Sequence, residues 1–281
     1  EISMAGAWRL LWLALLIILI VLIILLGFPW MSKVQRLRQI KRLATWIPAS
    51  VGIKITVKGE LPEELRNASF GSGSTGYVVC ANHISFVDIF VLDSILPCRF
   101  VAKKEIASWP LFGWISKGVN TLFIDRSRKR AVLEIGETMA SALKDGDHVL
   151  FFPEGRTGGG MTLLPFYSNL FAAAPIAKAK VLPISLRYTL YGETTDIPSY
   201  AGATPMFTII RHIVATRGLG VEATILPAIS SEGLDRHEIC ATTSAAIAAS
   251  LGVEDATAKK QEQLLANLRV EPQKSETEVS A

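Results

Sequence analysis

Cysteine is scarce in this chain, and its scarcity narrows the chemistry that is available. The 281 residues contain three cysteines, Cys80, Cys98 and Cys240, and four histidines. An odd and widely spaced set of cysteines forms no disulfide framework and no zinc-binding pattern, and it agrees with a reducing compartment. We therefore predict neither a disulfide nor a metal site.

Basic runs interleaved with aromatic residues are also missing beyond the N-terminal segment. The net charge is +4, and no cluster of lysine and arginine interleaved with aromatic residues occurs in the globular part. Such a cluster is the usual signature of a nucleic-acid-binding surface. The sequence therefore indicates no nucleic-acid partner.

Charge is entirely absent from one long segment near the start. The 21 residues from Leu10 to Trp30 read LLWLALLIILIVLIILLGFPW. As a helix they would span roughly 31 Å, about the thickness of a bilayer's hydrocarbon core, and they show no polar face. Because no small-x-small cleavage site follows, we expect residues 1–31 to form a retained membrane anchor. The sequence leaves open whether this anchor crosses the bilayer or bends around Gly27 and Pro29 within one leaflet.

The next segment, residues 32–48, is basic and amphipathic. Its bases are Lys33, Arg36, Arg38, Lys41 and Arg42, whereas a single base, Arg9, precedes the apolar run. This asymmetry predicts that the bulk of the chain lies on the cytoplasmic face of a membrane, which we take to be a bacterial inner membrane. Apolar residues at helical spacing favour an interfacial helix on anionic lipid, with a solvated helix packed on the domain as the alternative.

Beyond these segments, short apolar runs alternate with helical patterns. Strands are predicted at residues 52–59, 77–82, 99–103, 120–125, 148–153, 181–189 and 220–228, and helices at 85–96, 128–146, 167–179, 205–218 and 235–251. Such alternation is typical of an α/β fold with a central sheet, here expected to be mixed, flanked by helices. We predict one domain over residues 49–252 and a polar, disordered tail over residues 253–281.

Two motifs in residues 70–90 indicate different chemistries. The glycines from Gly71 to Gly76 spell G-x-G-x-x-G. That pattern binds dinucleotides when a strand precedes it and a helix begins at its third glycine. Here the strand follows, so we interpret the glycines as a flexible connector.

The second motif, His83 and Asp88, comes directly after that strand, at a bend where Ser85 can cap a helix. A carboxylate that holds an imidazole in one tautomer is the usual arrangement of a general base. The alternative is a capping histidine near a surface aspartate. Cys80 and Ser85 are rival nucleophiles, but Cys80 lies in an apolar strand and Ser85 is better explained as a cap. The other histidines, at positions 148, 212 and 237, are interpreted as structural.

Four blocks occur in order along the chain: NHISFVD (82–88), GVNTLFIDR (118–126), FPEGRT (152–157) and VLPISL (181–186). Together they resemble the glycerolipid acyltransferase family, of the lysophosphatidic acid (1-acylglycerol-3-phosphate) type, over most of residues 50–228. The resemblance implies transfer of a fatty acyl group from coenzyme A or acyl carrier protein to a lysophospholipid hydroxyl, without a metal or redox cofactor. It also implies that His83 removes the hydroxyl proton, that Asp88 orients His83, and that no covalent enzyme intermediate forms.

The resemblance further implies that basic residues bind the acceptor's phosphate. Arg126 closes the second block, and a guanidinium is well shaped for a phosphate. An ion pair with Asp125 is the alternative for Arg126. Lys104, together with Lys103, would add positive charge to the same site.

The last two blocks are expected to line the substrates. Glu154 and Gly155 would help bind the acceptor, Arg156 would contact its phosphate, and Pro183 would line the acyl side, although a proline is also tolerated at a sheet edge. The third block departs from the family's F-P-E-G-T-R-S, because Arg156 follows Gly155 directly. Downstream, Tyr167 and Asn169 stand where many members have a base and a glycine.

We therefore predict a membrane-anchored acyltransferase that makes phosphatidic acid from lysophosphatidic acid, in a tunnel or groove that opens onto lipid. The altered third block keeps open a different acceptor, such as a lyso-ornithine lipid, whose head group carries no phosphate. A non-catalytic, membrane-bound lipid-binding protein is the alternative from another class. The intact pair of His83 and Asp88 argues against it.

Overall fold

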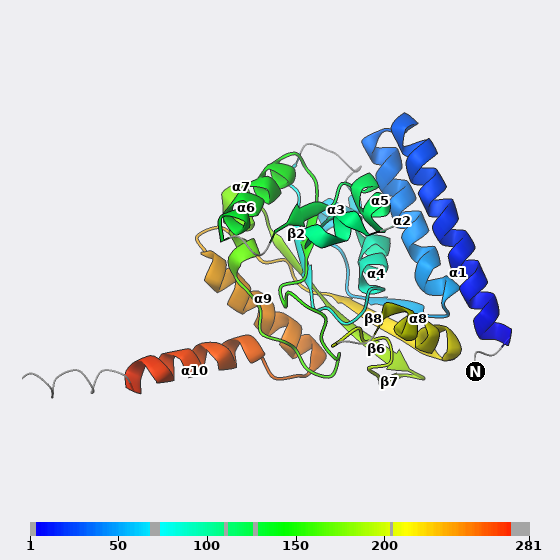
Figure 1. Ribbon diagram of the computed structural model, residues 1–281. Coiled ribbons are helices and arrows are strands. Elements are labelled where there is room, and N and C mark those ends of the chain that lie inside the picture. Colours follow the sequence, from blue (N-terminus) through cyan, green and yellow to red (C-terminus); the bar gives the residue numbers. More distant parts are fainter. Residues whose placement is uncertain (1–3, 68–73, 110–111, 126–128, 203–204, 271–281) are drawn as a thin grey trace, which may run out of the picture.

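The computed structural model describes residues 4–67, 74–109, 112–125, 129–202 and 205–270 (Figure 1). Every predicted strand forms, as β1 (Lys54–Lys58), β2 (Val78–Ala81), β3 (Arg99–Lys103), β4 (Leu122–Ile124), β5 (Val149–Phe151), β6 (Val181–Leu190) and β8 (Leu219–Ile225). A further short strand, β7 (Glu193–Thr194), pairs with the end of β6. The predicted α/β fold is confirmed.

The strands form one mixed sheet in the order β1-β8-β6-β2-β5-β3-β4. The β6–β8 pair is antiparallel, whereas β2 runs parallel to both of its neighbours, β5 and β6. Because β2 and β5 run in the same direction side by side, the segments that follow them leave the sheet at the same edge. His83 follows β2 and Glu154 follows β5, so the topology brings the first and third sequence blocks together.

Helices cover both faces of the sheet (Figure 1). One face carries α6 (Lys129–Lys144), α7 (Ala173–Ala177) and α9 (Arg236–Leu251), and the other carries α4 (Asp88–Ile95) and α8 (Met206–Ala215). Shorter elements are α3 (Glu63–Asn67), α5 (Phe112–Gly118), η3 (Lys104–Ser108) and η4 (Asn169–Ala172). Alternate side chains of the fully buried strand β2 enter the two cores, which explains why its sequence is an unbroken apolar run.

The predicted anchor is the first helix of an antiparallel pair (Figure 1). The pair consists of α1 (Met4–Leu22), a π-helical turn η1 (Ile23–Gly27), a 3-10 turn η2 (Phe28–Trp30) and α2 (Lys33–Ser50). Within the described residues, Met4–Trp30 is the one helical segment that is long and apolar enough to cross a membrane. The chain reverses at Gly27 and Pro29, the positions where the sequence allowed a bend.

The helical segment formed by α1 and η1 contacts the domain near both of its ends. The Arg9 guanidinium donates hydrogen bonds to the carbonyl oxygens of Val214 and Thr216, at 3.0 and 3.1 Å. At the other end, Gly118 packs so closely on Ile24 that an added Cβ would lie 2.2 Å from the Ile24 Cγ2 atom. The helix therefore lies along the domain, as expected for the bent hairpin rather than for an anchor that leads away from it.

Helix α2 packs one face on the domain. Ser32 caps it through a reciprocal capping box with Gln35, and its buried residues Leu43, Ala44 and Ile47 belong to the side that meets α4. The amphipathic pattern predicted the buried face only in part, because Leu43 of the apolar stripe is buried whereas Trp46 is 39% exposed. Packing on the domain matches the alternative interpretation of this segment, and contact of its basic face with lipid stays a prediction.

The prediction of a disordered tail was wrong for residues 256–270, which form α10 (Ala256–Val270). The Asp255 carboxylate explains where the helix begins, because Oδ1 accepts the Thr257 backbone N–H and the Ser244 hydroxyl. The Phe166 N–H also donates to the Thr257 hydroxyl. These bonds attach the first turn to the domain, and the helix-favouring composition of the segment continues it.

A proline in a strand is usually tolerated at a sheet edge, but Pro183 does not lie at one. It belongs to β6, an interior strand, where it is level with Cys80 of β2. Its carbonyl oxygen accepts the N–H of Leu226, which comes one residue after β8 ends. The missing proline N–H therefore falls where the antiparallel ladder stops, so little pairing is lost.

Candidate functional site

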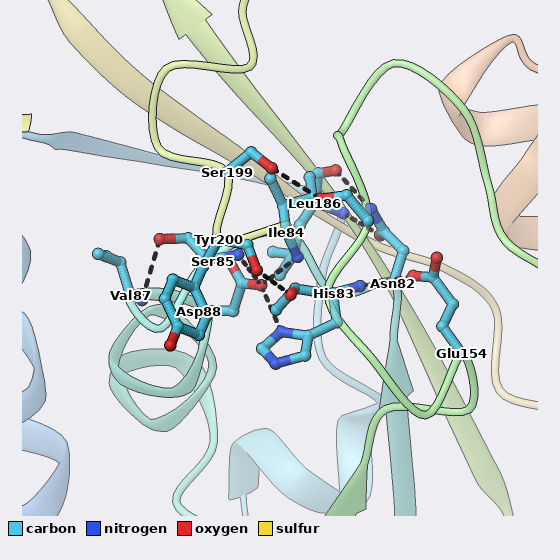
Figure 2. Close-up of polar contacts among 12 residues, drawn as sticks. Asn82, His83, Ile84, Ser85, Val87, Asp88, Glu154, Leu186, Ser199 and Tyr200 are labelled. Carbon is cyan, nitrogen blue, oxygen red and sulfur yellow. Dashed lines mark hydrogen bonds and ion pairs between the residues drawn. The ribbon is translucent and has the colours of Figure 1, made fainter. Parts of the chain in front are cut away.

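His83 and Asp88 form a hydrogen-bonded pair at the carboxyl end of β2 (Figure 2). The His83 Nδ1 atom lies 2.8 Å from Asp88 Oδ2, and the His83 side chain is 18% exposed while that of Asp88 is fully buried. The bend between β2 and α4 allows five residues to separate two side chains that face each other. With Nδ1 bound to the carboxylate, Nε2 is the ring nitrogen that is left to accept a proton, and it has no partner among the described residues.

Asp88 is held by four donors. Oδ2 also accepts the backbone N–H groups of Ile84 and Ser85, at 2.7 and 2.9 Å, and Oδ1 accepts the Tyr188 hydroxyl at 2.7 Å. Burial, and then the charge of Asp88, raise the pKa of Tyr188 well above its usual value, so this hydroxyl stays a donor. The carboxylate is thereby fixed in one orientation, which fixes the imidazole.

The third block wraps around the backbone of His83. Glu154 is 3% exposed and accepts the N–H of His83 at 2.6 Å and that of Leu164 at 3.0 Å (Figure 2). Gly158 donates its N–H to the His83 carbonyl oxygen at 2.7 Å. Burial raises the pKa of Glu154 to about 7. Both Glu154 oxygens are thus occupied by the protein, which gives this residue a bracing role beside the predicted acceptor-binding role.

The rival nucleophiles are poorly placed. Cys80 is fully buried, and burial raises the pKa of its thiol, so a thiolate is disfavoured. Ser85 is also fully buried, and its hydroxyl oxygen accepts the Val87 N–H. These positions favour His83 over both as the reactive group.

The remaining histidines have structural contacts. His148 Nδ1 accepts the Tyr77 backbone N–H at 3.0 Å, and burial lowers the pKa of His148 to about 4. The His212 carbonyl oxygen accepts the backbone N–H of Thr216 at the end of α8. The His237 ring accepts a hydrogen bond from Arg236 on the exposed surface. None of these three lines a cavity together with His83.

An apolar cavity of about 250 Å³ begins at His83. Phe86, Ile89 and Phe90 line it from the start of α4, and Phe100 lines it from β3. Its opposite wall belongs to the N-terminal helix pair, through Ile20, Ile24, Phe28, Ile40, Leu43 and Ala44. The predicted anchor is therefore also a wall of the site.

A second, polar cavity of about 470 Å³ lies beside the first. Lys103, Gly155, Arg156, Tyr167 and Asn169 line it. Phe152 lines it too, and its ring stacks on the His83 imidazole with centroids 3.8 Å apart. His83 lines the first cavity and Phe152 lines the second, so the stacked rings connect the two walls. A substrate with an apolar chain and an anionic head could therefore have its reacting group at His83.

The other predicted residues are distributed unevenly. Arg126 lies outside the described residues, as do Gly71 and Gly73 of the glycine motif. Lys104 is exposed, and its Nζ lies 3.9 Å from the Asp125 carboxylate. The lysine that lines the polar cavity is Lys103. Gly76 is needed for close packing, because an added Cβ would lie 1.8 Å from the Asp147 carbonyl oxygen.

Sequence reasoning missed Phe152, Tyr188 and Asn82. Phe152 stands in the third block and Asn82 in the first, where the Asn82 amide exchanges two hydrogen bonds with the Leu186 backbone. Their blocks were a usable signal for both. Tyr188 reaches Asp88 across 100 residues of chain, and no local pattern marks it.

The chain is similar in sequence to known acyltransferases. A family model described as Acyltransferase matches residues 54–187. The chain is 34% identical over 228 residues to the 1-acyl-sn-glycerol-3-phosphate acyltransferase of Neisseria meningitidis serogroup B, an alignment that covers 73% of this chain and 88% of the relative. It is 30% identical over 224 residues to the lyso-ornithine lipid O-acyltransferase of Pseudomonas aeruginosa, covering 78% of this chain and 81% of the relative.

A solved structure has the same fold. The crystal structure of the 1-acyl-sn-glycerophosphate acyltransferase from Thermotoga maritima matches with a TM-score of 0.62, covering 88% of this chain and 96% of that chain. At 18% identity this similarity concerns the fold alone.

Proposed function

The chain belongs to the acyltransferase family, and from this premise we propose that it acylates lysophosphatidic acid to form phosphatidic acid. The observation that carries the proposal is the His83–Asp88 pair, because His83 lines the apolar cavity and stacks on Phe152, which lines the polar one. The name of the Neisseria relative supports this acceptor. The donor would be a fatty acyl thioester of coenzyme A or acyl carrier protein, with no metal or redox cofactor.

In the proposed reaction, His83 Nε2 takes the proton from the acceptor's free hydroxyl as its oxygen attacks the thioester carbonyl carbon. The new ester C–O bond forms, the C–S bond breaks, and the leaving thiolate takes the proton back from the imidazolium. Asp88 stabilises that imidazolium without becoming protonated. Because the acyl group passes directly to the acceptor, no covalent enzyme intermediate is required.

The head group of the acceptor would occupy the polar cavity. Lys103 and Arg156 line it and supply positive charge for a phosphate. Arg126, Lys104, Gly155 and Pro183 keep the roles that the family resemblance implies, as proposals. The acyl chain would occupy the apolar cavity, whose walls exclude the water that would otherwise hydrolyse the thioester.

One observation favours a second acceptor. Tyr167 and Asn169 line the polar cavity where a base and a glycine were expected, and Arg156 is shifted by one position. A lyso-ornithine lipid, with its amino-acid head group, needs fewer bases than a phosphate does. The name of the Pseudomonas relative supports this alternative.

We also propose that the helix pair embeds in the cytoplasmic leaflet of a bacterial inner membrane. Apolar side chains are exposed along α1, at Leu11, Trp12, Leu15, Ile18 and Leu19, and in η1 at Leu26. The contacts of α1 and η1 with the domain favour a helix that lies along the lipid surface. The basic residues of α2 would then face anionic head groups.

Acyl transfer by the purified chain in phospholipid vesicles tests the function. Palmitoyl-CoA is supplied with lysophosphatidate or with lyso-ornithine lipid, to wild type, to His83→Ala and to a matched control, His212→Ala. We expect phosphatidate from the wild type and the control, and a loss of at least about a hundredfold in His83→Ala. If only the lyso-ornithine lipid is acylated, the acceptor is that lipid and not lysophosphatidate. Equal turnover by wild type and His83→Ala would refute catalysis by His83.

A further inference from the structure

The apolar cavity contains one acid that the proposed reaction does not use. Asp93 lines the cavity and is 6% exposed. On α4 it continues the face formed by Phe86, Ile89 and Phe90, at the spacing of one helix stripe. A carboxyl group on such a stripe is unusual, because burying it without partners is costly.

The fold explains one of the two oxygens of Asp93. Oδ1 accepts the backbone N–H of Cys98 at 3.0 Å, which closes the turn between α4 and β3. No donor or acceptor among the described residues bonds to Oδ2. If Oδ2 were also completely enclosed, it would be a buried oxygen without a partner. Among the described residues Thr243 Oγ1 is the one such side-chain atom, so Asp93 Oδ2 has open space beside it. The space that Asp93 lines is the cavity.

Asp93 lies far along the cavity from the reacting group. His83 follows the carboxyl end of β2, whereas the Cys98 that Asp93 contacts comes directly before the amino end of β3. Both strands run parallel to β5, so the carboxyl end of β2 and the amino end of β3 lie at opposite edges of the sheet along the strand direction. Along α4, Asp93 is about 7.5 Å beyond Asp88. A chain whose thioester is at His83 would pass Asp93 with its middle, not with its first carbons.

The chemical state of Asp93 suits a hydroxyl partner. Burial raises its pKa to about 8, so near neutral pH it carries a proton that can be donated as well as an oxygen that can accept. The hydroxyl residues on the cavity lining are Ser116, Thr121, Thr157 and Tyr200. A serine or asparagine would cap Cys98 equally well, so the cap alone does not require an acid.

We propose that Asp93 recognises a hydroxyl group in the middle of the acyl chain, and that the preferred donor is therefore a mid-chain hydroxyacyl thioester. This inference rests on the proposed acyl transfer, with the chain in the apolar cavity. A plain alkyl chain would cover Oδ2 without replacing a hydrogen bond, whereas a chain hydroxyl would both donate and accept one. Sites that bind a substrate hydroxyl in this way discriminate strongly against the analogue that lacks it.

The test compares donors of matched length in the same vesicle assay. Stearoyl-CoA competes with 3-hydroxystearoyl-CoA, 10-hydroxystearoyl-CoA and 18-hydroxystearoyl-CoA, in wild type, Asp93→Ser and Asp93→Asn. Asp93→Ser keeps an oxygen to cap Cys98 and removes the second oxygen, while Asp93→Asn keeps two polar atoms and the shape. We expect the wild type to favour the mid-chain hydroxyl by roughly tenfold in kcat/KM, Asp93→Asn to keep most of this preference, and Asp93→Ser to lose it.

The wild-type series is decisive even if a variant fails to fold. Equal kcat/KM for stearoyl-CoA and 10-hydroxystearoyl-CoA overturns the role of Asp93 while the proposed function stands, as does an unchanged preference in a folded Asp93→Ser. If no donor is turned over, the proposed function fails. Binding of the same thioesters to His83→Ala, measured by thermal shift, then decides the inference: tighter binding of the 10-hydroxy chain supports it, and equal binding overturns it.

Discussion

At the scale of single residues, the site depends on how completely Asp88 is bonded. Its two oxygens accept from a ring nitrogen, two backbone amides and one phenol, all within 2.9 Å. Together these bonds hold the buried carboxylate in one position. The orientation of His83 is therefore set mainly by the backbone that follows β2, with Tyr188 as the distant contribution.

Tyr188 is accordingly predicted to be a positioning residue. In Tyr188→Phe, Asp88 loses one donor, and we expect kcat to fall roughly tenfold because a hydrogen bond to a charged group is lost. The acidic limb of the kcat/KM profile should move to higher pH, since a carboxylate with fewer donors holds the imidazolium more strongly. Tyr77→Phe, another buried tyrosine whose hydroxyl bonds a carboxylate, Glu64, is the control. An unshifted pH profile in Tyr188→Phe would argue for a purely structural role.

His148 is predicted to make the fold sensitive to acid. Its pKa is lowered to about 4 by burial, against an ordinary value near 6.5, so the unfolded chain binds the proton first. The contribution of His148 to stability is therefore complete above about pH 6.5 and is lost as the pH falls toward about 4. Because the residue is partly exposed, we expect an effect on the order of 1 kcal/mol.

Melting temperatures measured between pH 7 and pH 4.5 check this expectation. His148→Asn keeps an acceptor for the Tyr77 N–H, and its melting temperature should fall less over that range than the wild type's. His237→Asn, on the exposed surface, should follow the wild type. Parallel curves for wild type and His148→Asn would contradict the assignment.

At the scale of elements, contact between η1 and α5 depends on a glycine. An added Cβ on Gly118 would lie 2.2 Å from Ile24, which lines the apolar cavity. Gly118→Val should therefore displace η1, lower stability by about 1–3 kcal/mol through overpacking, and reduce turnover of long-chain donors. Gly136→Ala in α6 is the control, because its Cβ would meet nothing within 4 Å and should stabilise the helix slightly. Equal thermal stability and equal turnover in the two variants would show that the contact is unimportant.

The elements themselves could be predicted well, and their arrangement less well. Period and composition identified the main strands. β2 and β5 are buried on both faces and read as unbroken apolar runs, whereas β8 alternates between buried and half-buried residues. Strand order has no local signal, so the interior place of Pro183 could not be foreseen. The start of α10 depends on the hydrogen bond between Asp255 and Ser244 of α9. This contact joins the tail to the domain, and no local sequence pattern predicts it.

The same division holds for the candidate site. His83, Asp88, Glu154 and Arg156 stand in blocks of local sequence, so they could be selected in advance. Which lysine faces the polar cavity depends on the alternation of side chains at the end of β3, and the structure selects Lys103 where the sequence favoured Lys104. The place of Asp93 on a cavity wall could not be predicted, because the cavity forms only when α1 and α2 pack against the domain.

At the scale of the whole molecule, one side is built for lipid. Leu15, Leu19 and Leu22 are between 42% and 47% exposed on α1. Burying the exposed half of each in a membrane contributes about 1 kcal/mol, so their joint replacement by serine should weaken binding to anionic vesicles by roughly a hundredfold. Ile176→Ser, a change of a residue 41% exposed on α7, should leave vesicle sedimentation unchanged. Equal loss in both variants would mean that adsorption is not localised to α1.

The bonds between Arg9 and the end of α8 also impose an order on biosynthesis. Arg9 is translated 205 residues before Val214. At typical elongation rates, about 10–40 s pass before that partner leaves the ribosome. Throughout this interval the most apolar helix of the chain exists without the domain that later lies along it. If α1 enters lipid during synthesis, as the proposed membrane location requires, the catalyst would assemble on a helix that is already in the membrane, and targeting would precede folding of the site.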